Sequence, residues 1–318
     1  MYYIGIDIGG MSIKGGLVTE NGELVLKQSI VTRPTANEDV IIDDIHKLIC
    51  SLLENKGLHE YQLSGVGIGV PGTVDGEKGR VRFTPNINFK NTPLVEKLSA
   101  RFQYKFPIRI SNDANCAALG EAVWGGGGGV SDSITVTLGT GVGTGFYISG
   151  KLFEGVGGAG TEGGHIVIKT GGEKCGCGRR GCWEAYAAAP ALIRQVEAAI
   201  AKNPDSELAE IAKEEGDVTG KTVFEAVEKG CPVAAKVLKK YVSYVGDGLV
   251  NLVNIFRPKV IIMGGGVSMA GDALIKPLQR YVSLHSFASK YSPKTKIVQA
   301  KLGNDAGILG AATLTMNK

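Results

Sequence analysis

The sequence predicts an α/β fold with two halves built on a common plan. Runs rich in Ile and Val that end in glycine recur along the chain, and patterns typical of amphipathic helices lie between several of them. A weak internal repeat also relates a segment near the N-terminus to one near the middle of the chain. At 318 residues the chain is long enough for one large domain or two of ordinary size, and we expect two.

The first half alternates strands with helices. Residues 2–8 and 66–70 are apolar and predict buried strands. A helix is expected to begin near Asn91, a residue type that caps helices well, because three apolar residues after it share one face. A short apolar run at residues 108–110 then leads to an alanine-rich helix after Asp113.

The second half follows five consecutive glycines. These residues, 125–129, hold regular structure poorly and predict a mobile loop near a domain boundary. Strands are expected at residues 134–138 and 260–263. Apolar residues at spacings of three and four predict a helix from about Tyr244 to Phe256, which the following Arg-Pro pair should end.

The internal repeat consists of residues 6–24 and 136–152. Both segments contain an apolar strand, a glycine-rich turn with hydroxyl residues, a second strand, a tight Asn-Gly or Ser-Gly turn and a third strand. Each would present a hairpin tip of exposed backbone N–H groups, and two such tips could hold a phosphate chain. Two ordinary β-hairpins would leave the same pattern, so the repeat alone leaves phosphate binding open.

Two familiar nucleotide motifs fail on their context. Residues 67–72 match G-x-G-x-x-G, but Pro71-Gly72 and Asp75-Gly76 predict turns where the helix that holds a pyrophosphate should begin. Residues 145–152 end in Leu152 and not in the hydroxyl residue that a P-loop needs for magnesium. We therefore expect neither a Rossmann dinucleotide site nor a P-loop.

Composition excludes further classes of protein. A hydrophobic share of 43% and a charged share of 21% are typical of globular proteins and not of disordered or fibrous ones. The net charge of +4 is spread along the chain, which predicts no nucleic-acid or anionic-membrane surface. The N-terminus lacks a signal-peptide pattern, and no apolar run approaches the roughly 18 residues of a membrane span. We expect a cytoplasmic protein without membrane association.

Three of the six cysteines, Cys175, Cys177 and Cys182, lie close together in a glycine-rich segment. In a cytosolic protein such a group indicates a metal site more often than disulfides. His165 precedes Cys175 by a short distance, so we expect it to be the fourth ligand. A closed Cys3His set is typical of structural zinc, with a redox or free-thiol cluster as the alternative.

Several motifs together resemble the ROK family of sugar kinases and repressors. They span nearly the whole chain and comprise DIGGMSIK (7–14), GVPGTVD (69–75), SNDANCAALGE (111–121), LGTGVGTG (138–145), H-x9-C-x-C-x4-C-x-E (165–184), MGGGVS (263–268) and GNDAGILGAA (303–312). The resemblance implies a duplicated RNase H-like fold of the actin, hexokinase and Hsp70 type, with ATP and a sugar bound between two domains. The internal repeat is what such a duplication should leave.

The resemblance also implies a domain organisation. We expect a small α/β domain of residues 1–120 with a C-terminal segment of about 300–318, and a large α/β domain of about 121–299 that carries the zinc loop. Family repressors have an N-terminal helix-turn-helix, whereas here the first expected strand begins at Tyr2. An enzyme that does not bind nucleic acid is therefore expected, as a homodimer or homotetramer by analogy with the family.

The implied activity is ATP-dependent phosphorylation of a hexose at its 6-hydroxyl, with glucose as the first choice and ATP, Mg²⁺ and structural Zn²⁺ as the bound groups. Asp113 would be the base that accepts the hydroxyl proton, a role compatible with capping a helix. Asp7 would position Mg-ATP. Two phosphate loops and an adenosine-side turn would bind the nucleotide through Gly9, Gly10, Ser12 and Lys14; Gly139, Thr140, Gly141 and Gly143; and Gly264, Gly265 and Gly266. Met11 departs from the family pattern, in which a threonine usually stands there, and this puts nucleotide affinity in doubt.

The resemblance further implies a set of sugar-binding residues, which comprises Asn86, Asn112, Asp113, Glu162, His165 and Glu184. The zinc loop would fix the segment that carries Glu184. It would also orient His165 so that one imidazole nitrogen binds the metal and the other reaches a sugar hydroxyl.

The identity of the sugar stays open at this point. Fructose, N-acetylglucosamine and N-acetylmannosamine are alternatives to glucose, because discrimination among sugars depends on pocket shape. A non-catalytic sugar sensor fits less well, since the base, magnesium and phosphate positions are all present. An actin-like ATPase is disfavoured by the cysteine loop beside the sugar positions.

Overall fold

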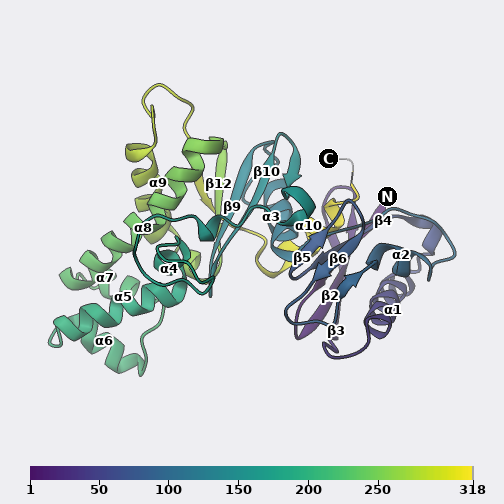
Figure 1. Cartoon of the computed structure of the whole chain (residues 1–318), viewed down its shortest axis with the longest axis horizontal. Helices are drawn as coiled ribbons and strands as arrows, with labels where there is room; N and C mark the ends of the chain where they lie inside the picture. Colours follow the sequence, from purple (N-terminus) through teal and green to yellow (C-terminus); the bar gives the residue numbers. More distant parts are fainter. Residues whose placement is uncertain (317–318) are drawn as a thin grey trace. The chain divides into compact units, whose positions relative to one another are not determined.

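The computed structural model describes residues 1–316 and contains two five-stranded sheets with helices packed around them (Figure 1). The first sheet has the order β3-β2-β1-β4-β8 and the second the order β11-β10-β9-β12-β13. The strands of the first are β1 (Tyr2–Ile8), β2 (Ser12–Thr19), β3 (Leu24–Val31), β4 (Leu63–Val70) and β8 (Ile108–Asn112). Those of the second are β9 (Ser133–Leu138), β10 (Val142–Ile148), β11 (Lys151–Phe153), β12 (Val260–Gly264) and β13 (Lys296–Gln299).

The two sheets share one topology. When the five strands of each sheet are numbered by their order along the chain, they lie across the sheet in the order third, second, first, fourth and fifth. In each, the second and third strands pair antiparallel and the fourth and fifth pair parallel. The α/β class and the duplicated plan expected from the internal repeat are therefore confirmed.

The remaining elements connect and cover these sheets. A small sheet has the order β5-β6-β7, with β5 (Thr73–Asp75), β6 (Arg80–Phe83) and β7 (Lys90–Thr92). The helices are α1 (Glu38–Lys56), α2 (Leu94–Ser99), α3 (Asp113–Val123), α4 (Glu184–Ala187), α5 (Ala189–Lys202), α6 (Glu207–Glu215), α7 (Thr222–Glu228), α8 (Pro232–Phe256), α9 (Asp272–His285) and α10 (Ala306–Thr313). Short 3₁₀ helices are η1 (Glu60–Gln62), η2 (Val156–Gly158), η3 (Gly163–His165), η4 (Gly266–Ala270) and η5 (Gly303–Asp305).

The chain divides into two compact units. Unit 1 comprises Met1–Ile134, Gly145–Thr161 and Lys301–Lys318, and unit 2 comprises Thr135–Thr144 and Glu162–Ala300. The division passes through β9 and β10. The domain boundaries expected at about residues 120 and 300 remain a prediction, because a compact packing unit need not coincide with a folding domain.

Strand β1 shows how the first sheet places a carboxylate. Side chains alternate between the two faces of a strand. Ile4, Ile6 and Ile8 are buried in the core cluster that also contains the apolar side chains of α1. Gly5 and Asp7 lie on the opposite face, where they contact α10. The polar side chain at the end of β1 therefore lies against α10, away from the main core.

Alternate glycines let α10 approach the first sheet closely. A Cβ atom at Gly67 of β4 would lie 1.6 Å from the carbonyl oxygen of Ala311, and one at Gly310 would lie 1.6 Å from that of Cys116. Neither clash could be relieved without moving backbone. Glycine at these positions thus serves helix–sheet and helix–helix contact.

Two predicted helix starts were wrong. The second helix begins at Leu94 after Pro93, because Asn91 lies in β7 with a φ of 53° and does not cap a helix. The helix expected from about Tyr244 begins at Pro232, whose ring suits the first turn of a helix, and its apolar face continues through that added length. Its end at Phe256 is confirmed, with Arg257 in the left-handed conformation.

The five-glycine segment is a loop, as expected, but it is tied down. The N–H of Gly126 donates to the buried Glu121 carboxylate at 2.9 Å, and the N–H groups of Gly127 and Gly129 donate to carbonyls at the end of α3. Its backbone groups are thus used to close the C-terminal end of α3. In residues 1–316, no helix has both the length and the apolar character needed to cross a membrane.

Candidate active site and metal centre

The first glycine-rich turn, between β1 and β2, is closed by backbone and hydroxyl contacts. The N–H of Gly9 donates to the carbonyl of Ser12 at 2.9 Å. Thr32 holds the turn from β3, since its hydroxyl donates to the carbonyl of Gly9 at 2.7 Å and its N–H donates to that of Met11 at 3.0 Å. The Met11 side chain is 88% exposed, so the residue that departs from the family pattern makes no core contact.

Two carboxylates, Asp7 and Asp113, lie beside this turn within unit 1. Burial raises the pKa of Asp113, opposed by hydrogen bonds that include the N–H of Ala114 at 2.9 Å. Burial also raises the pKa of Asp7, the charge of Lys14 lowers it, and the charge of Asp113 raises it further. Asp113 is therefore close enough to Asp7 for its charge to affect the ionisation of Asp7.

Asn112, and not Asp113, is the N-cap of α3. Its side-chain oxygen accepts hydrogen bonds from the N–H groups of Ala114 at 2.9 Å and Asn115 at 3.3 Å, which makes it the N-cap of α3. Its amide donates to the carbonyl of Gly72 at 2.9 Å. Asp113 is then the first residue of α3, where the helix dipole favours its ionised form.

Asn86 lies near the first turn. A Cβ atom at Gly10 would be 3.9 Å from the Cβ of Asn86, whose side chain is exposed. All of the predicted site residues of unit 1 lie at or beside the first glycine-rich turn and the start of α3. They are Asp7, Gly9, Gly10, Ser12, Lys14, Asn86, Asn112 and Asp113.

The second glycine-rich turn, between β9 and β10, belongs to unit 2 and contacts Glu184. The N–H of Gly139 donates to the carbonyl of Gly141 at 3.0 Å, and Thr140 is exposed at the tip. The N–H of Val142 donates to Oε2 of Glu184 at 3.0 Å. A Cβ atom at Gly141 would lie 2.6 Å from that oxygen, so glycine is needed for the carboxylate to approach.

The turn after β12 packs against the end of β9. Gly265 has a φ of 81°, and a Cβ atom there would lie 2.4 Å from the carbonyl oxygen of Leu138. The hydroxyl of Ser268 donates to the carbonyl of Gly265 at 2.7 Å. Unit 2 thus places the turn of Gly264, Gly265 and Gly266 beside the residues that lead into the second glycine-rich turn, Gly139 to Gly143.

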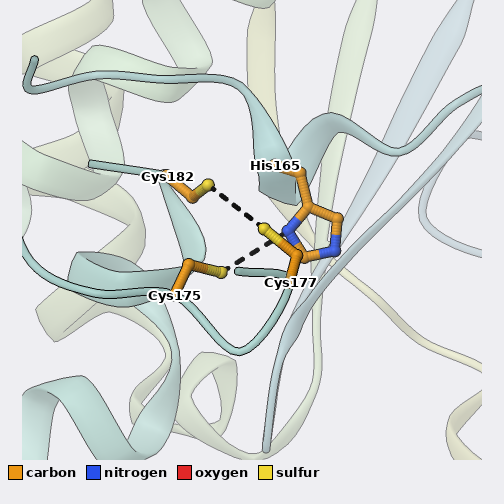
Figure 2. Close-up of side chains that lie close together, drawn as sticks. All are labelled: His165, Cys175, Cys177 and Cys182. Carbon is orange, nitrogen blue, oxygen red and sulfur yellow. Dashed lines mark hydrogen bonds between the residues drawn. The ribbon is translucent and has the colours of Figure 1, made fainter. Parts of the chain in front are cut away.

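The predicted metal ligands converge. One ligand atom from each of His165, Cys175, Cys177 and Cys182 lies within 4.8 Å of the others. Nδ1 of His165 is 3.7 Å from Sγ of Cys175, and Sγ of Cys177 is 3.7 Å from Sγ of Cys182 (Figure 2). The four residues therefore form a candidate metal site.

The donor set and its spacing fit zinc. Thiolate ligands about 2.3 Å from a tetrahedral zinc ion lie about 3.8 Å from one another. The 3.7 Å separation of the Cys177 and Cys182 sulfur atoms matches this spacing. Gly178, with a φ of 90°, allows the tight turn in which the N–H of Cys175 donates to the carbonyl of Arg179 at 2.9 Å. A local turn thus brings the cysteines to one point.

Trp183 anchors this loop to unit 2. Its ring is fully buried, and its indole N–H donates to the carbonyl of Tyr244 in α8 at 3.0 Å. A Cβ atom at Gly248 of α8 would lie 2.0 Å from that ring. Since Trp183 stands between Cys182 and Glu184, the cysteine cluster and the carboxylate share one anchor.

The His165 ring has its two nitrogens on different sides. Nδ1 faces the sulfur atoms, and Figure 2 shows the second ring nitrogen on the side away from them. Glu162 precedes this histidine in the same tight segment, is exposed, and accepts a hydrogen bond from the N–H of His165 through its carbonyl at 3.1 Å.

Several supporting residues gave no signal in the sequence. Thr32 closes the first turn, Thr144 accepts a hydrogen bond from the N–H of Gly163 at 2.9 Å, and Ser111 donates to the carboxylate of Glu154. These pairs are distant in sequence, so no local spacing marks them.

Comparisons with known proteins show the family of the chain. The model of the ROK family matches residues 3–318. The chain belongs to the ROK family. It is 38% identical to a glucokinase of Streptomyces coelicolor over 98% of this chain and 96% of that protein. It is 30% identical to the xylose repressor of Bacillus subtilis over 99% of this chain and 77% of the repressor.

A solved structure of the family gives the same fold. A ROK family glucokinase from Streptomyces griseus, in complex with glucose and AMPPNP, is 36% identical and aligns over 99% of both chains with a TM-score of 0.73. The two-domain fold of the actin and hexokinase type expected for this ROK chain is therefore confirmed.

Proposed function

We propose that this protein is an ATP-dependent glucokinase that converts glucose to glucose 6-phosphate. The observation that carries the proposal is the likeness to the S. griseus glucokinase, over 99% of both chains, in complex with glucose and an ATP analogue. The 38% identity to the S. coelicolor glucokinase, over nearly the full length of both proteins, supports the same activity.

In this proposal Asp113 is the catalytic base. The 6-hydroxyl oxygen of glucose attacks the γ-phosphorus of ATP, the bond from that phosphorus to the bridging oxygen breaks to release ADP, and the hydroxyl proton passes to the Asp113 carboxylate. Asn112 and the first turn of α3 hold this carboxylate in place. Its raised pKa suits proton acceptance better than that of an ordinary surface acid.

The nucleotide would be held by glycine-rich turns. The backbone at the exposed tips of these turns, Gly10, Met11 and Thr140, suits phosphate oxygens, and the turn at residues 264–266 would take the adenosine side. Asp7 would hold Mg²⁺, which neutralises charge on the phosphates when bound. Asp7 is partly buried next to Asp113 and Lys14, an arrangement that fits a carboxylate with a cation partner.

The sugar would be read by Asn86, Asn112, Asp113, Glu162, His165 and Glu184. We also propose that the cluster of His165, Cys175, Cys177 and Cys182 holds structural Zn²⁺, since its donor set and spacing fit that ion. The zinc would fix Nδ1 of His165, so that its other nitrogen can hydrogen-bond to a sugar hydroxyl.

A cytoplasmic location and a homodimeric or homotetrameric state complete the proposal. None of the six cysteines, which all lie within residues 1–316, forms a disulfide, a condition that suits the reducing cytosol. Size-exclusion chromatography with light scattering would determine the oligomeric state.

The activity is tested by ADP release from Mg-ATP with glucose, mannose, fructose, N-acetylglucosamine and N-acetylmannosamine. We expect the highest kcat/KM with glucose. If another sugar gave the highest kcat/KM, the proposed kinase activity would stand and the proposed substrate would change. Absence of sugar-stimulated release would favour a sugar sensor, the function suggested by the likeness to the repressor.

A further inference from the structure

A second group of potential metal ligands lies in unit 1, outside the residues proposed to bind sugar and nucleotide. His46 and Cys50 are one helical turn apart on α1, so their side chains share a face. Nε2 of His46 is 3.5 Å from Sγ of Cys50. Together with a carboxylate oxygen of Glu60, the three ligand atoms lie within 4.8 Å of one another.

The end of α1 brings Glu60 back to this face. Gly57 ends the helix in the left-handed conformation, with a φ of 68°, and its N–H donates to the carbonyl of Glu54 at 2.9 Å. The N–H of Leu58 donates to the carbonyl of Leu53 at 2.9 Å. At this cap the chain reverses direction, so that η1 begins beside the C-terminal end of α1.

Two of the three ligands are oriented by the segment of residues 102–104. Oε2 of Glu60 accepts hydrogen bonds from the N–H groups of Gln103 at 3.0 Å and Tyr104 at 3.2 Å. The His46 ring packs edge-on against Phe102, with centroids 4.8 Å apart. Outer contacts of this kind fix the orientation of metal ligands in proteins.

The donor chemistry selects a class of ion. Imidazole, thiolate and carboxylate together suit Zn²⁺ and similar transition metals, whereas Mg²⁺ and Ca²⁺ prefer oxygen ligands alone. All three residues are partly exposed, so an ion can reach them from solvent. Three protein ligands leave one position of a tetrahedral ion for water.

We propose that His46, Cys50 and Glu60 bind one divalent transition-metal ion of the Zn²⁺ class, in addition to any ion held by the cluster of His165 and the three cysteines. His46 and Cys50 contact each other directly, and a carboxylate oxygen of Glu60 lies within 4.8 Å of both of their ligand atoms. The site is independent of the proposed kinase activity.

The experiment is equilibrium dialysis of the full chain against Zn²⁺, with metal content measured per chain. The variants are Cys50→Ser, His46→Gln and Glu60→Gln, the last of which keeps an oxygen to accept from residues 103 and 104. His285→Gln is the matched control, because His285 is an exposed histidine at the end of another helix. The cluster of Cys175, Cys177 and Cys182 is intact in every protein and contributes equally.

The wild type and the His285 variant should each hold one zinc more than any of the three variants, with affinity at this site falling about a hundredfold or more when a ligand is lost. Added zinc should also raise the melting temperature of the wild type further than that of Cys50→Ser. Near-UV circular dichroism confirms folding of each variant, and Cys50→Ala replaces any Cys50→Ser protein that does not fold. Equal zinc content in the wild type and the variants overturns the proposal, and loss in Cys50→Ser alone overturns the three-ligand set.

Discussion

Glu184 connects the cysteine loop to the second glycine-rich turn through Val142. Its Oε2 accepts a hydrogen bond from the N–H of Val142 at 3.0 Å, while its Oε1 lies 3.5 Å from Sγ of Cys175. One carboxylate therefore touches both a predicted metal ligand and the turn proposed to bind phosphate. A change at the proposed metal site would have a direct route, within unit 2, to the turn proposed to bind phosphate.

Glu184→Ala should raise KM for ATP as well as for glucose. The substitution removes the acceptor of the Val142 N–H, and an unpaired buried donor costs about 1–3 kcal/mol, enough for roughly a tenfold change in binding. Glu184→Gln keeps an acceptor oxygen and should affect ATP less. Steady-state kinetics with each substrate varied in turn distinguishes the two, and an unchanged KM for ATP in the Ala variant would show that the connection is not used.

Cys177→Ser should remove about one zinc per chain and weaken glucose binding. Cys177 is an exposed ligand, so the substitution changes the metal site with little effect on the core. Elemental analysis and isothermal titration with glucose measure the two effects together. Cys231→Ser, at a buried cysteine outside both potential metal clusters, is the control and should leave both unchanged. Normal glucose binding in a zinc-free Cys177 variant would contradict the coupling of metal and sugar.

The value of kcat/KM should fall toward acid pH, with a midpoint above the pKa of an ordinary aspartate. Burial raises the pKa of Asp113 from its ordinary value of 3.8, and the base is active only when ionised. The value of kcat/KM should therefore be constant above the raised pKa and fall as pH drops through it. An acid limb centred at or below 3.8 is the contrary outcome.

Glu121→Gln should destabilise unit 1 by about 1–3 kcal/mol. The carboxylate is only 3% exposed and accepts hydrogen bonds from the N–H groups of Gly126, Lys301 and Leu302. Both of its oxygens are used, so a glutamine NH2 group would face backbone donors in either orientation. Urea unfolding measures the loss, and Glu197→Gln on the exposed face of α5 is the control. Equal stabilities of the two variants would mean that these bonds contribute little.

The sequence predicted the main apolar strands and the cysteine cluster because both depend on local patterns, whereas the short strands β5, β6, β7 and β13 were not predicted. The alternation of Ile4, Ile6 and Ile8 marks a strand with one core-facing side, and close spacing alone brings Cys175 and Cys182 together. Local capping signals were less reliable, because Asn91 has a capping side chain but belongs to a strand that pairs with β6.

The contacts between distant segments could not be predicted. Glu184 meets Val142, Thr32 meets Gly9, and Glu121 meets the backbone of Lys301 only after the sheets have formed. Nothing in the local sequence of these residues specifies a partner, since each is a common residue type in an ordinary setting. The same applies to Gly67 and Gly310, whose need for glycine depends on how closely α10 packs.

The central claim is that Asp113 is the base of a glucose kinase. ADP release from Mg-ATP and glucose should be at least about a hundredfold slower in Asp113→Asn than in the wild type, while glucose still binds to the variant in a titration. Asp272→Asn, at an exposed acid on α9, should keep the wild-type rate. Wild-type turnover in Asp113→Asn would contradict the assignment of the base and the mechanism that depends on it.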